Sequence, residues 1–374
     1  MKTTTTETSL GGEETQTILA SVLHGPQDLR LEPRLLPPPS PSELQVEIRA
    51  TTICGSDLHY YRHFRIGDIA VQEPLTLGHE SSGVVVGVGT SILPNDFKPG
   101  ERVALEVGVP CSECDRCKEG RYNICAQMRF RSSARSRPHF QGTLQERVNH
   151  PADVAIHAVR RASLPAQGAS VLIFGAGAIG LLCAAVCKAK GARNIMIVDT
   201  QGDRIHFATS QRFANNELKV EAKRGTSVEE NLQVAKDTAE RLCVEKAQGG
   251  FDVVMECTGA EGPTQTAIYA ARSGGRVVLV GFGNPVQTLP ISSAAMREVD
   301  IVGTFRYVRT YQEAIRMLEQ GQLDQIVVNN LLTHRFEGLE GIEDAFKMAS
   351  KTHDQDGRLV LKVLIEMPNN QLAW

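Results

Sequence analysis

The sequence predicts an α/β fold in which a β-rich, barrel-like domain is joined to a doubly wound parallel sheet. A chain of 374 residues is too long for one ordinary hydrophobic core and is comfortable for two. Between residues 18 and 109, short β-rich runs are broken by Gly and Pro, which indicates antiparallel strands. From Ser170 onward strand-like and helical segments alternate, which is typical of a parallel sheet covered by helices.

Each predicted element follows from a local pattern. The β-rich part contains the short runs ILASVL, LQVEIRATTI, SGVVVGVG and RVALEVGV, which are rich in residues that favour strands. The second part contains the strand-like runs VLIFG, NIMIVD, FDVVMECTG and GRVVLVGFG. Helical patterns separate these runs, and the first of them spans residues 178–190. The charged stretch 217–248 predicts a solvated helix, and two amphipathic helices are expected at 312–319 and 342–349.

The last strand-like run, LVLKVLI, follows a sheet that is already complete, so we expect it to return and pair with the first domain. The predicted division is a tail at 1–16, a β-rich domain at 17–154 and 305–374, and a parallel-sheet domain at 155–304. The tail is rich in Thr and Glu and resembles neither a secretory signal nor a mitochondrial presequence. We therefore expect a disordered tail in a cytosolic protein.

Composition excludes several classes of partner. The chain has 40 Lys and Arg against 43 Asp and Glu, a formal charge of -3, so no global field attracts nucleic acid or an anionic membrane. No apolar run approaches the roughly 20 residues that a membrane helix needs. Nine cysteines in a large chain without a secretory signal are expected to be reduced. The expected partners are small molecules.

A glycine pattern, Gly175-x-Gly177-x-x-Gly180, follows an apolar strand at residues 171–174 and opens a helix. Gly175 permits a tight turn, Gly177 lets the backbone approach a pyrophosphate, and Gly180 lets the helix pack on the strand. The helix N-terminus then faces the phosphates. This context predicts a Rossmann-type dinucleotide site.

Asp199 ends the second strand of this unit, about 20 residues beyond the last glycine, where a carboxylate accepts both ribose hydroxyls of a dinucleotide. The same carboxylate repels a 2′-phosphate, so NAD is expected rather than NADP. Arg204 is near enough in the sequence to keep this preference from being absolute.

Two groups of residues have the composition of zinc sites. Cys111, Cys114, Cys117 and Cys125 have the spacing C-x2-C-x2-C-x7-C, and four thiolates close a tetrahedral shell at about 2.3 Å per bond, which predicts a structural zinc. The second group is dispersed and consists of Cys54, His79 and Glu80. Three protein ligands plus water are typical of a catalytic zinc, and Asp57 is expected to accept the distal ring proton of His79.

The order of these motifs resembles that of the zinc-containing medium-chain dehydrogenase family. The matching segments are Cys54-Gly55-Ser56-Asp57, Gly78-His79-Glu80, Pro99-Gly100-Glu101-Arg102-Val103, the four-cysteine loop, GAGAIG and Glu256-Cys257-Thr258-Gly259. Within that family CGSDLHYY, RIGD, REVDIVGTFRY and LLTHRF resemble the polyol branch of sorbitol, xylitol and arabinitol dehydrogenases, especially fungal ones. The resemblance runs from about Leu19 to Met367 and implies a GroES-like domain beside the Rossmann domain.

The resemblance implies a role for several side chains. The implied ligands of the catalytic zinc are Cys54, His79 and Glu80, and the implied route for the leaving proton is Ser56 and His59. The implied contacts to polyol hydroxyls are Tyr60, Arg306 and Tyr307. Further NAD contacts are expected at Ile179, Cys257, Thr258, Val280 and Phe305. Zinc polarises a secondary hydroxyl, and hydride leaves its carbon for NAD, so the product is a ketose; a homodimer or homotetramer is also implied.

One departure from the family concerns the segment after Ala152. Family members carry there a further stretch ending in Glu-Pro-Leu-x-Val, whose glutamate lies at the zinc, whereas this chain joins GTLQERVNHPA to VAIHAVRRA through Asp153 alone. Counted backward from Val154, His150 falls where that glutamate would be. An imidazole is a good zinc ligand, so His150 is an alternative ligand, although the strand that would place it is missing.

Three hypotheses are compatible with these patterns. The first is a cytosolic enzyme that uses NAD and two zinc ions to oxidise a polyol of the sorbitol, xylitol or arabinitol type. The second is a catalytically impaired NAD- and zinc-binding variant, made less stable by the missing segment. The third is a dehydrogenase specific for threonine or a simple alcohol. The patterns leave open which polyol is preferred.

Overall fold

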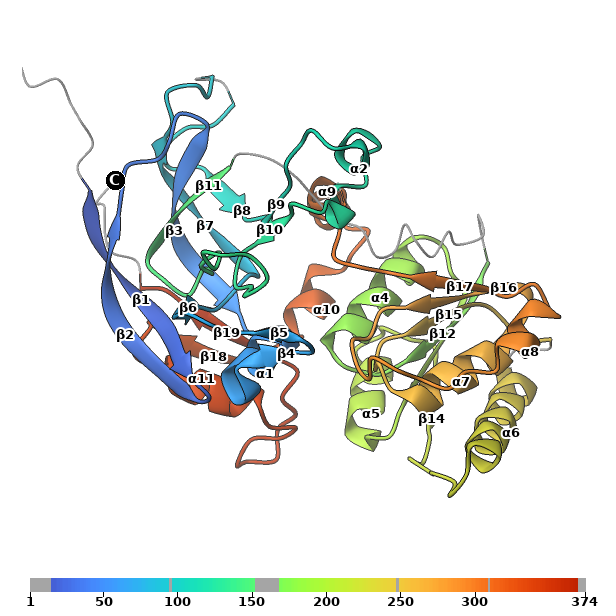
Figure 1. Ribbon diagram of the computed structural model, residues 1–374. Coiled ribbons are helices and arrows are strands. Elements are labelled where there is room, and N and C mark those ends of the chain that lie inside the picture. The colour runs from blue at the N-terminus through green and yellow to red at the C-terminus, as the bar shows by residue number, and fades with distance from the viewer. Residues whose placement is uncertain (1–14, 94–95, 152–167, 247–248, 309, 369–374) are drawn as a thin grey trace, which may run out of the picture.

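The computed structural model describes residues 15–93, 96–151, 168–246, 249–308 and 310–368. These residues form one part built on antiparallel sheets and a second part built on a six-stranded parallel sheet, which lie side by side (Figure 1). The predicted α/β fold class is thereby confirmed. In the part of the chain that is described, no helix combines the length and apolarity needed to cross a membrane.

Strand β3 (Glu43–Thr52) is the centre of the larger sheet of the first part, whose order is β18-β19-β3-β7-β8, with β11 also paired to β3. All of its pairs are antiparallel except β18 with β19, which is parallel. Its members besides β3 are β7 (Ser81–Val88), β8 (Arg102–Ala104), β11 (Arg147–Pro151), β18 (Leu332–Glu337) and β19 (Lys362–Glu366). Alternate side chains of β7 are buried, as expected for a strand with one face on a core. A smaller sheet has the order β2-β1-β6 and contains β1 (Gln16–Gly25), β2 (Asp28–Leu36) and β6 (Leu75–Thr76).

The C-terminal segment returns to the first sheet, as predicted. Strand β19 pairs antiparallel with β3, with Ile365 opposite Thr51. Helix α11 (Ile342–Ala349) packs beside it, and the ring of Phe346 lies 4.9 Å from that of Tyr61. Residues far apart in the sequence therefore share one core, which brings the start of β19 close to the end of β3.

The first part also contains several shorter elements. They are α1 (Gly55–His63), β4 (Arg65–Ile66), β5 (Ile69–Ala70), β9 (Gly108–Val109), α2 (Asp115–Lys118), η1 (Tyr122–Ile124), β10 (Arg129–Phe130), α9 (Tyr311–Glu319) and α10 (Gln325–Asn329). Helix α1 begins at Gly55 because Asp57, in its first turn, accepts the backbone N–H of Cys54 at 3.0 Å.

The parallel sheet has the order β14-β13-β12-β15-β16-β17. Its strands are β12 (Ser170–Phe174), β13 (Asn194–Asp199), β14 (Asn216–Lys219), β15 (Phe251–Glu256), β16 (Ala271–Leu279) and β17 (Asp300–Gly303). The helices between them are α4 (Ala178–Ala189), α5 (Gly202–Ser210), α6 (Val228–Lys246), α7 (Glu261–Ala270) and α8 (Ile291–Ala295).

Helices cover both faces of this sheet (Figure 1). Val171 and Ile173 of β12 share a buried cluster with side chains of α4 and α5, whereas Leu172 and Phe174 share another with side chains of α6 and α7. Because successive side chains of a strand point to opposite faces, both faces of β12 are buried. This is why the strand is apolar without alternation.

The prediction of one solvated helix over 217–248 is partly wrong. Residues 216–219 form β14, which pairs with β13, and the helix begins only at Val228. The exposed edge of β13 supplies backbone partners that outweigh the weak strand preference of these polar residues.

The predicted tail at 1–16 lies outside the described residues except at its end. Thr15 and Gln16 are described, and Gln16 begins β1. The predicted domain boundary at 154–155 also lies outside the described residues.

The turn between β12 and α4 is packed too closely for any side chain at Gly180. A Cβ atom there would lie 1.9 Å from the backbone oxygen of Gly175, and Gly175 itself has φ +97, a conformation that favours glycine. The first turn of α4 therefore rests directly on the end of β12, as the glycine pattern predicts.

Replacing Gly180 with Ala is expected to lower the free energy of unfolding by about 2 kcal/mol or more, because the methyl group overpacks against backbone that cannot move aside. Urea denaturation measures the change. Gly262→Ala is the matched control, since a Cβ atom at this position of α7 meets no atom within 4 Å, and it should stay within about 1 kcal/mol of the parent chain. Equal stability of both variants would contradict the close approach.

Candidate functional site

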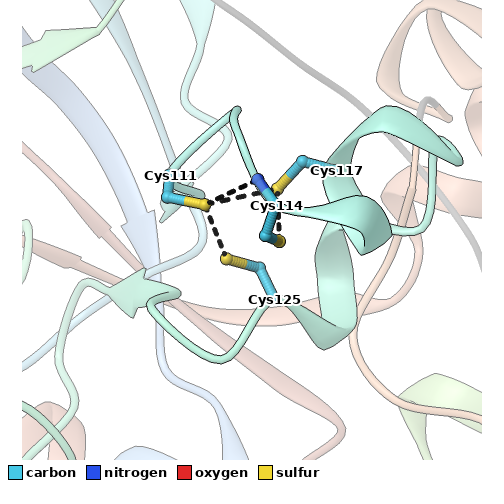
Figure 2. Close-up of side chains that lie close together, drawn as sticks. All are labelled: Cys111, Cys114, Cys117 and Cys125. Atoms are coloured by element: carbon cyan, nitrogen blue, oxygen red, sulfur yellow. Dashed lines mark hydrogen bonds between the residues drawn. The ribbon is translucent and has the colours of Figure 1, made fainter.

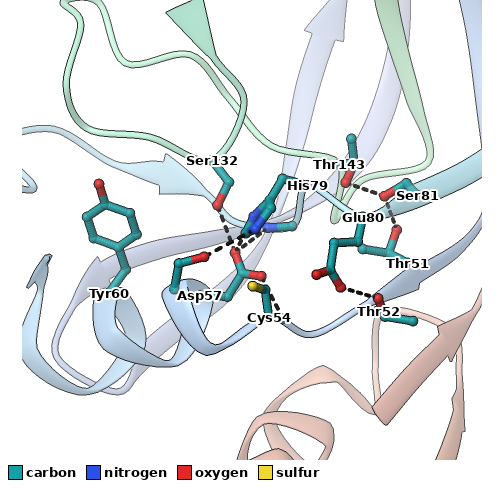
Figure 3. Close-up of polar contacts among 12 residues, drawn as sticks. Thr51, Thr52, Cys54, Asp57, Tyr60, His79, Glu80, Ser81, Ser132 and Thr143 are labelled. Atoms are coloured by element: carbon teal, nitrogen blue, oxygen red, sulfur yellow. Dashed lines mark hydrogen bonds and ion pairs between the residues drawn. The ribbon is translucent and has the colours of Figure 1, made fainter. Parts of the chain in front are cut away.

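Cys54, His79 and Glu80 converge from two segments of the first part (Figure 3). Cys54 precedes α1, and His79 and Glu80 lie immediately before β7. One ligand atom from each residue lies within 4.8 Å of the others. A thiolate, an imidazole and a carboxylate at this spacing fit a zinc ion with one position left open.

Asp57 holds this group together. Its Oδ1 lies 3.2 Å from Nδ1 of His79 and accepts the N–H of Gly78 at 3.0 Å and the hydroxyl of Ser132 at 2.8 Å. Burial by itself raises the pKa of Asp57, but the charge and hydrogen bond of His79, with the N–H groups of Gly78 and Cys54, outweigh it and lower that pKa. With Nδ1 on Asp57, Nε2 of His79 is the ring nitrogen that could bind a metal, in place of the Ser56 hydroxyl that lies 3.1 Å from it.

Glu80 has its own partners, which the sequence did not indicate. Lys362 of β19 places its Nζ 2.5 Å from Oε2 of Glu80, and the hydroxyl of Thr52 donates to the same oxygen. Burial raises the pKa of Glu80, but Lys362 and then His79 outweigh it, so the net direction is downward. Glu80 is thus held as a carboxylate.

His150 lies outside the ligand group, so the alternative that it replaces the family's glutamate is wrong. Among the described residues that group contains Cys54, His79 and Glu80. The buried ring of His150 accepts Nε–H of Arg131 at 3.2 Å on Nδ1 and donates from Nε2 to the carbonyl of Glu106 at 2.8 Å. Burial and the Arg131 charge lower its pKa to about 3. Neither ring nitrogen of His150 therefore remains for a metal. The segment after Pro151, where the sequence departs from the family, lies outside the described residues.

The three predicted residues of α1 differ in their surroundings. Ser56 Oγ lies 3.1 Å from Nε2 of His79 and so is next to one of the three candidate ligands. His59 is exposed, and partial desolvation, His63 and Arg62 lower its pKa, which favours a neutral ring that can accept a proton. Tyr60 is buried, and its hydroxyl accepts the backbone N–H of Ala134 at 3.2 Å.

Arg306 and Tyr307 both lie next to the ring of Phe130, which in turn lies next to the ring of His79. The sequence did not indicate Phe130. The Phe130 ring lies 5.6 Å from the His79 ring and 6.3 Å from that of Tyr307, and Cζ of Arg306 lies 3.9 Å from its centroid. Nη1 of Arg306 is buried and has no hydrogen-bond partner among the described residues. Burial lowers the pKa of Arg306 to about 10, so it still carries a charge. An unpaired buried donor of this kind is suited to a ligand hydroxyl.

The four cysteines of the α2 loop form a compact cluster (Figure 2). Their sulfur atoms lie 3.5 Å apart for Cys114 and Cys117, 3.5 Å for Cys125 and Cys111, and 3.9 Å for Cys111 and Cys117. A zinc ion with bonds of about 2.3 Å in a tetrahedron separates its sulfur ligands by about 3.8 Å. The residues therefore fit a closed four-thiolate shell, as the spacing predicts.

The glycine turn meets Asp199 at the carboxyl end of the parallel sheet. Asp199 accepts the N–H of Ala176 at 2.8 Å and that of Gln201 at 2.9 Å. Arg204 lies across the turn, with Nη1 3.8 Å from the Cβ position built on Gly177 and with a buried Nε that has no described hydrogen-bond partner. A cavity of about 500 Å³ begins at this turn and is lined by Gly175, Asp199, Thr258 and residues of the β14–α6 loop.

Glu256 shapes the neighbouring loop. Its buried carboxylate accepts the N–H groups of Thr258 and Gly259, each at 2.8 Å. Cys257 and Val280 pack on the cluster beneath α4. Two of the other predicted NAD contacts leave large apolar side chains open to solvent, Ile179 at 49% and Phe305 at 43% exposure, as expected where a ligand would cover them.

Comparison with known proteins identifies relatives over most of the chain. Residues 40–160 match the family described as alcohol dehydrogenase GroES-like domain, and residues 178–320 match the zinc-binding dehydrogenase family. Sorbitol dehydrogenase from Rattus norvegicus is 38% identical, with 94% of this chain and 97% of the relative covered. Sorbitol dehydrogenase from Arabidopsis thaliana is 35% identical, with 93% and 95% covered.

Solved structures agree with this fold. An Escherichia coli oxidoreductase of unknown specificity has a TM-score of 0.79 at 26% identity and covers 95% of this chain and 100% of its own. L-idonate 5-dehydrogenase from Escherichia coli has a TM-score of 0.78 at 24% identity, with 94% and 99% covered, which shows the fold alone. By its sequence relatives and the domains it matches, the chain belongs to the zinc-containing medium-chain polyol dehydrogenase family.

Proposed function

We propose that the protein oxidises a secondary hydroxyl of a polyol to a ketone, with hydride transfer to NAD at a zinc centre made by Cys54, His79 and Glu80. The observation that carries this proposal is the convergence of these three side chains into one ligand group. The sorbitol dehydrogenases among the relatives support a polyol as substrate. Zinc, when bound, acts as a Lewis acid on the substrate oxygen.

Each protein group has a separate task in this proposal. Asp57 fixes the tautomer of His79, so that Nε2 faces the metal. Ser56 and His59 lie one helical turn apart on α1, which suits the transfer of the hydroxyl proton toward solvent. Arg306 offers its unpaired Nη1 to another hydroxyl of the polyol, and Tyr60 and Tyr307 are its proposed companions in substrate binding.

The proposed second zinc is structural and occupies the four-cysteine cluster, which gives two zinc ions per chain. All described cysteines are free of disulfides, which favours the cytosol as the proposed location, since thiols stay reduced there. The alternative remains a catalytically impaired protein that binds NAD and zinc without turnover, because the glutamate carried by family members after the position of Ala152 is missing from the sequence.

The purified full-length chain is expected to hold two zinc ions and to produce NADH when incubated with NAD and sorbitol or xylitol. Removal of metal by a chelator should abolish turnover, because no other Lewis acid is available to the substrate oxygen. Metal analysis and absorbance at the NADH band measure both. Two bound zinc ions without turnover would support the impaired alternative, and a preference for ethanol or threonine over polyols would contradict the proposed substrate.

Asp199→Ala is expected to raise the ratio of kcat/KM for NADP to that for NAD by about tenfold or more. The change removes the carboxylate that would repel a 2′-phosphate and leaves Arg204 beside Gly177 of the glycine turn. Steady-state kinetics with each cofactor measures the ratio. Asp203→Ala is the control, since Asp203 is exposed and pairs with His353 instead. An unchanged ratio would contradict the proposed role of Asp199.

The proposed homo-oligomer is expected to use the open edge of the parallel sheet at β17. Ile301 and Val302 of this strand are partly exposed, and the preceding segments expose Val286 and Met296 to 84% and 82%. An edge strand beside apolar side chains favours pairing with another chain. Sedimentation velocity should show that the parent chain is a dimer or tetramer. Ile301→Lys should shift the protein toward the monomer, whereas the control Val244→Lys on α6 should leave its oligomeric state unchanged. A monomeric parent chain would contradict the proposal.

A further inference from the structure

A largely buried ammonium group lies next to Glu80 of the proposed zinc centre. Lys362 is the first residue of β19, and its side chain is only 17% exposed. Its Nζ lies 2.5 Å from Oε2 of Glu80, and the Thr52 hydroxyl donates to the same oxygen. Two segments of the first part, β3 and the C-terminal strand, therefore fix one half of the Glu80 carboxylate.

The other half of that carboxylate is left for a metal. Among the contacts of the described residues, Oε1 of Glu80 accepts no hydrogen bond and forms no ion pair, whereas Oε2 has both. Glu80 lies in one ligand group with Cys54 and His79. The arrangement suits a carboxylate that is shared between an ammonium group and a cation.

The charges of the centre balance only when Lys362 is counted. With zinc bound, the His79 ring is neutral. Cys54 as a thiolate, Glu80 and Asp57 then contribute three negative charges, and the zinc ion contributes two positive ones. The Lys362 ammonium supplies the third positive charge. Without it, a buried centre would carry one uncompensated negative charge, which is costly in a poorly solvated site.

We propose that Lys362 is a positioning residue of the zinc centre, which shares Glu80 with the metal and so limits how much negative charge the carboxylate donates to it. This inference rests on the proposed zinc centre. A cation that receives less charge from Glu80 polarises a bound hydroxyl more strongly. Lys362 thus tunes the metal without touching the substrate.

A purely structural role for Lys362 predicts the opposite effect on the metal. If the ion pair only tied β19 to the sheet, its loss would loosen the site and weaken zinc binding. If Lys362 competes with zinc for Glu80, its removal takes away a positive charge that repels the ion and frees a carboxylate to bind it. The sign of the change in zinc affinity therefore separates the two roles.

The experiment compares Lys362→Met with Lys362→Arg in the full-length chain. Zinc affinity is measured by competition with a chromophoric chelator, and the binding step that Cys54→Ser abolishes is assigned to this centre. Lys362→Met is expected to bind zinc there about tenfold more tightly and to lower kcat about 10- to 100-fold. Lys362→Arg keeps the charge and should stay close to the parent chain in both measurements.

Two further variants isolate the effect of charge. Thr52→Val removes the other contact of the same carboxylate oxygen without a change in charge, so zinc should not bind more tightly. Lys236→Met removes an exposed lysine of α6 and should alter neither quantity. Weaker or unchanged zinc binding in Lys362→Met would overturn the inference. Because affinity is read without substrate, this result is independent of whether a polyol is turned over.

Discussion

The buried carboxylate of Asp57 is the interaction on which the candidate metal site depends. It receives N–H groups from Cys54 and Gly78, the ring of His79 and the hydroxyl of Ser132, and so joins the start of α1, the segment before β7 and the loop after β10. A buried carboxylate requires all these partners because its charge is otherwise poorly solvated. By meeting this need for hydrogen-bond partners, Asp57 also orients two of the candidate ligands, Cys54 and His79.

The two parts of the chain differ in how they pack and in where they place their candidate sites. The first part contains short, irregular segments, and these carry the candidate metal ligands, next to a buried polar network. The second part buries both faces of a parallel sheet, so its strands are apolar and its chemistry gathers where the strands end. The glycine turn and Asp199 lie at that edge.

Local sequence patterns were enough to predict the candidate sites whose residues all lie in one short segment of the chain. The four cysteines belong to one short loop, and the glycine turn to one strand–helix connection, so their spacing already limits the possible geometry. The returning strand was predictable because an apolar run must be buried somewhere. Strand β14 was not, because its polar residues pair only when β13 offers an edge.

The fold class, the two groups of candidate metal ligands and the glycine turn could be predicted from the sequence alone, because the patterns that indicate them are made of residue types that anyone can find along the chain. Only the tertiary structure decided which distant side chains complete the site. Ser132 reaches Asp57, Phe130 lies between His79 and Arg306, Lys362 meets Glu80, and His150 is bound elsewhere. The physical reason is that burial makes charge and hydrogen-bond partners act over Ångström distances, whatever their separation along the chain.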